Sequence, residues 1–226
     1  MYIDLDDRPL SERVADRIEQ MILANEIEPG DKIPNEYELA KDLNIGRGTI
    51  REAIKILVSR NVLKIKRGYG TYVCEKVGQM DDPLGFRFIQ DKKKLALDLV
   101  EIRMMLEPEI AAAAAVNATL EQVEVIQELC NKVSELIINQ EDYGKADMEF
   151  HNRIAFGTGN QVISRVIPII NSGIELFVDI TKHSKAGRAN ITHQAITDAI
   201  KNHDPERARQ AMKEHLQDNK ETLLEL

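Results

Sequence analysis

The chain has 226 residues, of which 43% are hydrophobic, and a formal net charge of −8 at pH 7. This length permits one large domain or two modest ones, and the hydrophobic content fits a soluble globular protein. No apolar segment is long enough to span a membrane, and the acidic start MYIDLDDRPL lacks the features of a signal peptide. Cys74 and Cys130 have neither metal-binding spacing nor enough partners for a disulfide framework, so a cytoplasmic location is expected.

The first predicted element is a helix that opens at Pro9-Leu10-Ser11 and ends at Glu28-Pro-Gly-Asp31. Its apolar stripe consists of Leu10, Val14, Ile18, Met21 and Ile22. A short helix over 35–43 follows, and Gly46 permits a sharp turn into a further helix. This order of elements is typical of a helix-turn-helix.

The helix after Gly46 has two different faces. One face is apolar, with Ile50, Ile54, Leu57 and Val58 at helical spacing. The other face carries three cations four residues apart: Arg47, Arg51 and Lys55. A helix of this kind can pack into a small domain and still present positive charge to the groove of DNA.

A two-stranded ribbon is predicted next, because Val62, Ile65 and the segment 71–73 favour strands and Arg67-Gly-Tyr-Gly70 suits a hairpin tip. Together these elements predict a winged helix-turn-helix domain over residues 1–77. Charge agrees with this prediction, since residues 41–76 hold nine Lys or Arg against three Asp or Glu in a chain that is acidic elsewhere. A basic island of this kind is the expected footprint of phosphate contacts, although a solvated basic surface is the alternative.

Residues 78–94 contain Pro83, two glycines and a Lys triplet, and are predicted to be a linker. The rest of the chain, 95–226, shows no strand pattern and predicts an all-α antiparallel bundle, so that the fold class is mainly α. Expected helices cover 95–115 with a kink at Pro108, 119–140 with a Thr119–Gln122 capping box, 142–156, 161–183 with an interruption near Pro168, 189–203, and 205 to the end after an Asp204 cap.

Four polar residues of the predicted bundle lie on apolar helix stripes. Asp147 and His151 are four residues apart beside Phe150 and Ile154; His193 shares a stripe with Ile196 and Ile200, and His215 with Ala208, Ala211 and Met212. Three imidazoles and one carboxylate directed inward are a plausible shell for a divalent metal. The alternative is that each histidine is a hydrogen-bonded core residue. His183 and His203, near helix ends, are expected to be structural or at the surface.

Arg103 is the second polar residue predicted to face inward, among Leu99, Ile102, Leu106 and Ile110. A buried guanidinium needs an anion. The residues alone leave two options open, which are the carboxylate of a bound ligand and an internal ion pair with Glu107 one turn later.

The segment IPNEYELAKDLNIGRGTIREAIKILVSRNVLKIKRGYGTYV resembles the winged-helix domain of the GntR family of bacterial transcription regulators. The C-terminal half resembles the FCD effector-binding domain of the FadR branch of that family. The matching pieces are DPLG at 82–85, DLVEIRMMLEPEIAAAAA at 98–115, DMEFHNRIAFGTGN at 147–160, HQAITDAI at 193–200 and MKEHL at 212–216.

The resemblance implies roles for particular residues. FCD domains bind small organic acids, and many hold a metal through one Asp and three His, which here are Asp147, His151, His193 and His215. The metal expected is Zn²⁺, with Ni²⁺ or Mn²⁺ as alternatives, and Arg103 matches the arginine that faces the effector. The positions that match DNA contacts are Arg47, Thr49 and Arg51 on the recognition helix and Gly68, Tyr69 and Gly70 at the wing tip, with Lys55 expected on the DNA backbone.

Two departures from the family pattern affect the DNA-reading positions. Tyr37 stands where members commonly have arginine, and Gly46-Arg47-Gly48 stands where they have Ser-Arg-Thr. The expected function is a homodimeric repressor that binds an inverted repeat in double-stranded DNA and responds to a small carboxylate held at the metal site. Two alternatives remain, namely a metal sensor in which the ion is the signal and a metal-dependent enzyme fused to a DNA-binding domain.

Overall fold

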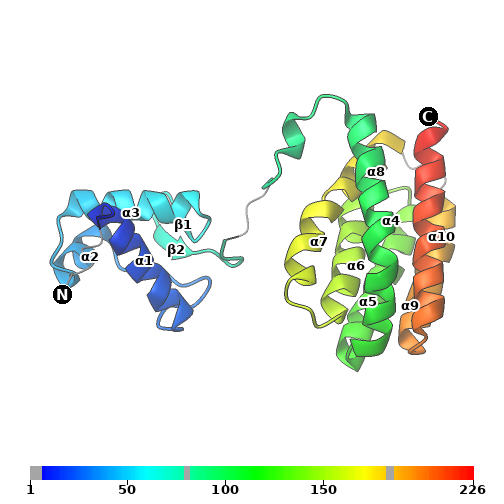
Figure 1. Ribbon diagram of the computed structural model, residues 1–226, viewed down its shortest axis with the longest axis horizontal. Helices are drawn as coiled ribbons and strands as arrows, with labels where there is room; N and C mark the ends of the chain where they lie inside the picture. Colours follow the sequence, from blue (N-terminus) through cyan, green and yellow to red (C-terminus); the bar gives the residue numbers. More distant parts are fainter. Residues whose placement is uncertain (1–6, 79–81, 182–185) are drawn as a thin grey trace. The chain divides into compact units, whose positions relative to one another are not determined.

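The computed structural model describes residues 7–78, 82–181 and 186–226, and the chain divides into two compact units, Met1–Pro83 and Leu84–Leu226. The division falls inside the segment 78–94 that the sequence predicts to be a linker. Within the described ranges both units are mainly helical, and the regular strands form one two-stranded sheet in the first unit (Figure 1). The mainly α fold class is therefore confirmed. No helix in these ranges is long and apolar enough to cross a membrane.

The described residues of the first unit, 7–78 and 82–83, form three helices and a β-hairpin. The elements are α1 (Leu10–Leu23), α2 (Glu36–Asp42), α3 (Arg47–Ser59), β1 (Leu63–Lys66) and β2 (Gly70–Val73). Helix α2 begins with a capping box, in which the Asn35 side chain accepts hydrogen bonds from the backbone N–H groups of Tyr37 and Glu38 and the Glu38 carboxylate accepts from the Asn35 N–H. This cap fixes where α2 starts, and therefore where the turn into α3 lies.

The core of this unit is formed by the inward faces of its helices and hairpin. Its buried apolar residues include Val14, Ala15, Ile18, Leu39, Ile50, Ala53, Ile54, Leu57, Leu63 and Val73. The predicted stripes are right at most positions, but Leu10 and Val58 are exposed. Small residues one position away from the predicted pattern, Ala15 and Ala53, allow the helices to approach more closely than the larger side chains would.

The wing pairs β1 with β2 in antiparallel register, from Leu63 opposite Val73 to Lys66 opposite Gly70. The sequence did not predict that residues before α2 also join this sheet: Ile33 N–H donates to Thr71 O, and Val73 N–H donates to Asp31 O. Gly70 has a φ of 122°, and a Cβ there would lie 2.5 Å from the Lys32 side chain. The Lys32 side chain can move away, so it is the positive φ that favours glycine at this position.

The second unit is a helical bundle. After a short 3₁₀ turn, η1 (Phe86–Phe88), its helices are α4 (Lys92–Asn117), α5 (Leu120–Ile138), α6 (Gly144–Gly157), α7 (Ile163–Asn171), α8 (Gly173–Thr181), α9 (Ala186–Lys201) and α10 (Pro205–Leu224). Helix α4 begins inside the segment predicted to be linker and continues through Pro108. The predicted caps are confirmed, since Thr119 and Gln122 form a capping box and Asp204 accepts from Arg207 N–H.

The long helices pack against one another around two clusters of buried apolar residues within the described ranges. Helix α10 packs along α4 and α9, α5 packs against α6 and α9, and α6 also contacts α4 (Figure 1). The larger cluster combines bulky and small residues, including Ile126, Phe150, Ile154, Ile196, Ile200 and Leu216 with Ala111, Ala114, Ala155 and Ala208. The alanines of α4 let the helices that carry the polar site approach each other closely.

One helix that the sequence predicts in the bundle is divided in the structure. The helix expected over 161–183 is two helices, α7 and α8, and the break falls at Ser172 rather than near Pro168, which lies inside α7. A Cβ at Gly173 would lie 2.5 Å from the Leu99 side chain, so the first turn of α8 sits directly against α4. The break therefore lies at a close contact between helices and four residues after the proline. His183 lies outside the described residues.

Candidate functional site

The three cations of α3 are all exposed, and Thr49 is half-buried beside them. The opposite face of the helix is packed into the core through Ile50, Ile54 and Leu57. This arrangement leaves Arg47, Arg51 and Lys55 on the surface of the unit, as expected for a helix that enters the major groove.

Two of these cations are bound to carboxylates of their own unit. Arg51 donates from Nε to Glu36 Oε1 and Oε2, both at 3.2 Å, and from Nη2 to Oε2 at 2.9 Å. Lys55 donates to Glu52 Oε1 at 2.9 Å. The hydrogen bond from Arg51, together with the positive charge of nearby cations, lowers the pKa of Glu36. The carboxylate is therefore ionised at neutral pH and lies among the charges that are expected to meet DNA.

The wing tip is also solvent-exposed. Arg67, Gly68 and Tyr69 form the loop between the strands, and the Tyr69 N–H donates to Lys66 O. Gly68 and Gly70 both have positive φ, 81° and 122°, which explains why glycines stand at these positions. The predicted DNA-contact residues of the wing thus lie in or directly after one exposed loop, which also carries Arg67.

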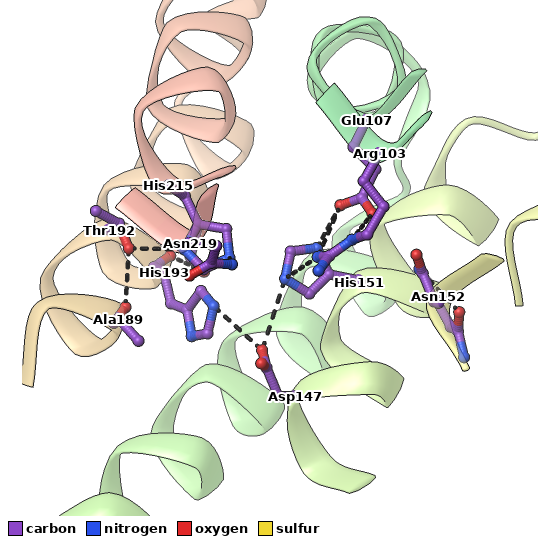
Figure 2. A network of polar contacts seen from close by, with 12 residues as sticks. Arg103, Glu107, Asp147, His151, Asn152, Ala189, Thr192, His193, His215 and Asn219 are labelled. Atoms are coloured by element: carbon purple, nitrogen blue, oxygen red, sulfur yellow. Dashed lines mark hydrogen bonds and ion pairs between the residues drawn. The ribbon is translucent and has the colours of Figure 1, made fainter. Parts of the chain in front are cut away.

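The bundle brings the four predicted metal ligands together in its interior. Asp147 and His151 come from α6, His193 from α9 and His215 from α10 (Figure 2). One ring nitrogen from each of the three histidines lies within 4.8 Å of the others. Asp147 Oδ1 is 3.2 Å from His193 Nε2 and 3.6 Å from His151 Nε2, so that the carboxylate lies between two imidazoles.

Several polar atoms of this cluster are buried without hydrogen bonds, although a buried polar atom normally has a partner. Among the described residues they include Asp147 Oδ1 and both ring nitrogens of His193. The 3.2 Å contact between Asp147 and His193 is an ion-pair distance but lacks hydrogen-bond geometry. A carboxylate oxygen and an imidazole nitrogen without hydrogen-bond partners are donor atoms that a divalent metal such as zinc takes.

The remaining two histidines are oriented by residues around them. His151 Nδ1 lies 2.6 Å from Glu107 Oε2, which fixes the ring with its Nε2 facing the cluster. His215 Nδ1 lies 2.9 Å from Thr192 Oγ1, whose hydroxyl in turn donates to Ala189 O. Since these contacts place the ring protons on Nδ1, both Nε2 atoms keep a lone pair, as metal-binding histidines require. Asn219 Nδ2 is 3.2 Å from His215 Nε2.

Burial controls the protonation of the cluster. It lowers the pKa of His193 to about 4 against the opposing effect of Asp147, and it lowers the pKa of His215 well below its usual value. Burial alone would raise the pKa of Glu107, but the Arg103 guanidinium and the His151 ring outweigh it and lower this pKa to about 2. Neutral imidazoles beside an ionised carboxylate are the protonation states that metal coordination needs at neutral pH.

Arg103 lies at the edge of the cluster and pairs internally. Its Nε donates to Glu107 Oε1 at 2.6 Å, and its Nη2 lies 3.2 Å from His151 Nε2. The guanidinium thus has the ion pair that the sequence offered as an alternative, and its contact with an effector stays a prediction. Ile102 and Leu106, expected to surround it, are partly exposed, whereas Leu99 and Ile110 are buried.

Three contacts of the site were not predicted from the sequence. Asn219 lies four residues after His215 on α10, and this helical spacing could have indicated that the two side chains meet. Thr192 is adjacent to His193, but its contact is with His215 on another helix. The contact of Glu107 with His151 also joins two helices, α4 and α6, so that no local pattern indicates it.

A winged helix-turn-helix with exposed cations, carried on the same chain as a helical bundle with a buried polar site, defines a DNA-binding transcription regulator. Residues 10–73 match the gntR family of bacterial regulatory proteins, and residues 98–218 match the FCD domain. The chain belongs to the GntR family and has the architecture of its FadR branch.

Relatives of similar length share both parts. The chain is 27% identical over 223 residues to the HTH-type transcriptional repressor NanR of Escherichia coli K12, covering 92% of this chain and 82% of NanR. It is 29% identical to the HTH-type transcriptional regulator YcbG of Bacillus subtilis, covering 96% of this chain and 94% of YcbG. A solved structure of a Streptococcus agalactiae GntR is 37% identical, with a TM-score of 0.81 over 93% of this chain and 99% of that one. These relatives are regulators, and the alternative of an enzyme is set aside.

Proposed function

We propose that this regulator is a repressor whose affinity for an inverted-repeat operator is controlled by a small organic acid at a metal site in the bundle. Two copies would place their α3 helices in successive major grooves, with Arg47 and Arg51 at guanine edges or phosphates, Thr49 beside them and Lys55 on the backbone. Gly68, Tyr69 and Gly70 would approach the minor groove. The repressor name of the E. coli relative NanR supports the sign of regulation.

The observation that supports the metal proposal is the set of buried polar atoms without a hydrogen bond. Asp147 Oδ1 and both ring nitrogens of His193 lack hydrogen bonds, and one ring nitrogen from each of His151, His193 and His215 lies within 4.8 Å of the others. Asp147, His151, His193 and His215 would hold the ion, and zinc suits a shell rich in imidazole, with nickel or manganese as alternatives. A bound ion would supply a Lewis-acidic position for a carboxylate oxygen.

Arg103 would hold the other end of such an acid, because its guanidinium lies beside His151 in the same interior. Its partner Glu107 keeps that guanidinium in place until an external carboxylate shares it. The acid would favour one arrangement of the two copies over another, and it would change operator affinity by its differential affinity for the two arrangements.

A second function, metal sensing, is favoured by one observation. Because Glu107 already pairs with Arg103, this guanidinium has a counter-charge without an organic acid. In that case the ion alone would be the signal, and the acid-binding role of Arg103 would be absent.

Native mass spectrometry of the purified full chain tests the first step. We expect a dimer mass with one divalent ion per subunit, which is lost in Asp147→Asn and His193→Gln and retained in His203→Gln, a matched change of an exposed histidine. A monomer without metal, in protein supplied with zinc, would overturn the proposal.

DNA binding tests the control step. Duplexes selected by the protein from a random pool are titrated with chelated protein, with zinc-loaded protein, and with zinc-loaded protein plus a panel of small mono-, di- and tricarboxylates. Effector control predicts an affinity change of about 5- to 150-fold that requires both zinc and an acid and is lost in Arg103→Gln. The same change with zinc alone would establish metal sensing instead.

A further inference from the structure

A carboxylate lies within the cationic surface of the DNA-binding unit. Glu36, the first residue of α2, receives three hydrogen bonds from Arg51, at 2.9 to 3.2 Å, and both of its oxygens are engaged. The two side chains are 33% and 54% exposed. An acidic group at this place opposes the phosphates that the neighbouring cations are expected to attract, so it weakens DNA binding unless it has another role.

Stability of the fold does not supply that role. Exposed ion pairs contribute little to folding, since water screens them and long side chains lose freedom when they pair. Helix α2 is already capped by Asn35, whose side chain accepts two backbone N–H groups. Glu36 is therefore more significant for the position it imposes on Arg51 than for the energy of the pair.

The geometry of the pair determines which edge of the guanidinium is left for DNA. The Nε–H and one N–H of Nη2 form the side edge, and this edge is directed at Glu36. The N–H groups that point away, on Nη1 and on the other half of Nη2, form the end edge. Two parallel donors on that edge match the O6 and N7 acceptors of guanine in the major groove.

We propose that Glu36 is a specificity-determining positioning residue, which holds Arg51 so that its end edge reads guanine and at the same time reduces the attraction of this surface for DNA of any sequence. The inference rests on the proposed role of Arg51 as a DNA contact. The Glu36 carboxylate would thus have two effects. It would lower the affinity for DNA of any sequence, and it would increase the discrimination between sequences.

The test uses the full-length protein and a pool of duplexes with about 20 randomised base pairs, two turns of the helix. Glu36→Gln keeps the shape and a hydrogen-bond acceptor but removes the charge. We expect it to bind unselected duplex several-fold more tightly, with a salt dependence steeper by up to about one. In the selected sequences, the preference for guanine at one position of each half-site should fall by a factor of about 5 to 150.

Glu52→Gln is the matched control, because Glu52 is an exposed carboxylate of α3 that accepts a hydrogen bond from Lys55 rather than from Arg51. It removes the same charge and should tighten unselected binding without changing the selected sequence. If Glu36→Gln and Glu52→Gln behave alike, the positioning role is wrong and Glu36 acts only through its charge.

Arg51→Gln separates this inference from the function on which it rests. The guanine preference lost in Glu36→Gln should also be lost in Arg51→Gln. If Arg51→Gln leaves the selected sequence unchanged, the assignment of Arg51 as a reader is itself wrong. If instead Glu36→Gln changes a cytosine position that Arg51→Gln leaves intact, Glu36 contacts the base directly and its positioning role is overturned. Circular dichroism of each variant checks that the fold is retained.

Discussion

The DNA-binding unit and the bundle each contain an arginine bound to a glutamate, and the two pairs differ mainly in burial. The side chains of Arg51 and Glu36 are 54% and 33% exposed, whereas those of Arg103 and Glu107 are 2% and 3% exposed. Water can solvate either partner if the first pair breaks, so that pair contributes little to folding. The interior offers no such replacement in the second pair. The same kind of pair thus lies on the surface that is expected to meet DNA in one unit and supports the buried fold in the other.

Replacing the buried Glu107 is expected to cause the largest decrease in the free energy of unfolding. Glu107→Gln leaves the buried guanidinium of Arg103 without its counter-charge, and breaking a buried pair in this way lowers the free energy of unfolding by about 3–5 kcal/mol. Urea denaturation of the chelated full chain, followed by far-ultraviolet circular dichroism, measures the change.

Glu109→Gln is the control for this change. Glu109 stands on the same helix and binds Arg209 through hydrogen bonds of 2.7 and 3.0 Å, but it is exposed. We expect a much smaller change in the free energy of unfolding, because water can solvate the guanidinium of Arg209 once its partner is removed. Equal effects of the two substitutions would show that burial does not decide the role of these pairs.

The comparison also explains which parts of the site the sequence predicts. Helical spacing places Asp147, His151, His193 and His215 inward, because each stands on an apolar stripe, and this requires only local geometry. The order of three helices and a wing in the first unit can also be predicted locally, because turn and cap residues mark where each element begins and ends. The helix boundaries set by Thr119 and Asp204 are local as well.

Contacts between residues on different helices could not be predicted from these local patterns. Glu107 and His151 are 44 residues apart, and Arg51 and Glu36 are 15 apart. Their contacts depend on how helices are packed, which no single stripe determines. The break between α7 and α8 also lies at a contact between helices, where Gly173 comes close to Leu99.

Lowering the pH is expected to decrease the stability of the bundle through protonation of His193. The expected loss is smaller than that caused by Glu107→Gln. The folded-state pKa of about 4 lies below the ordinary value of 6.5, so that between these values the unfolded chain binds a proton that the folded chain does not. Stability is therefore lost as the pH falls through 6.5. At pH 5 the chelated protein should lose about 2 kcal/mol through this group alone.

The measurement is urea denaturation of chelated protein between pH 7 and pH 5. His215, whose pKa is also lowered by burial, adds to the loss with the same sign. His193→Gln should flatten the dependence, whereas His203→Gln, a change at an exposed histidine, should not. A dependence that His193→Gln leaves unchanged would show that His193 is protonated in the folded chain.

Replacing the exposed Lys55 is expected to have the smallest effect on the free energy of unfolding. It should weaken binding to DNA of any sequence by a similar factor. Its partner Glu52 is exposed, so Lys55→Gln should leave the free energy of unfolding unchanged within error. Binding to selected and unselected duplex should weaken by a similar factor, and the salt slope should fall by about one, because one phosphate contact is lost. Lys213→Gln removes the same charge from the bundle surface and should leave the slope intact. Weaker binding to the selected duplex alone would mean that Lys55 reads bases, and the division of α3 into a reading arginine and a backbone-bound lysine would then be wrong.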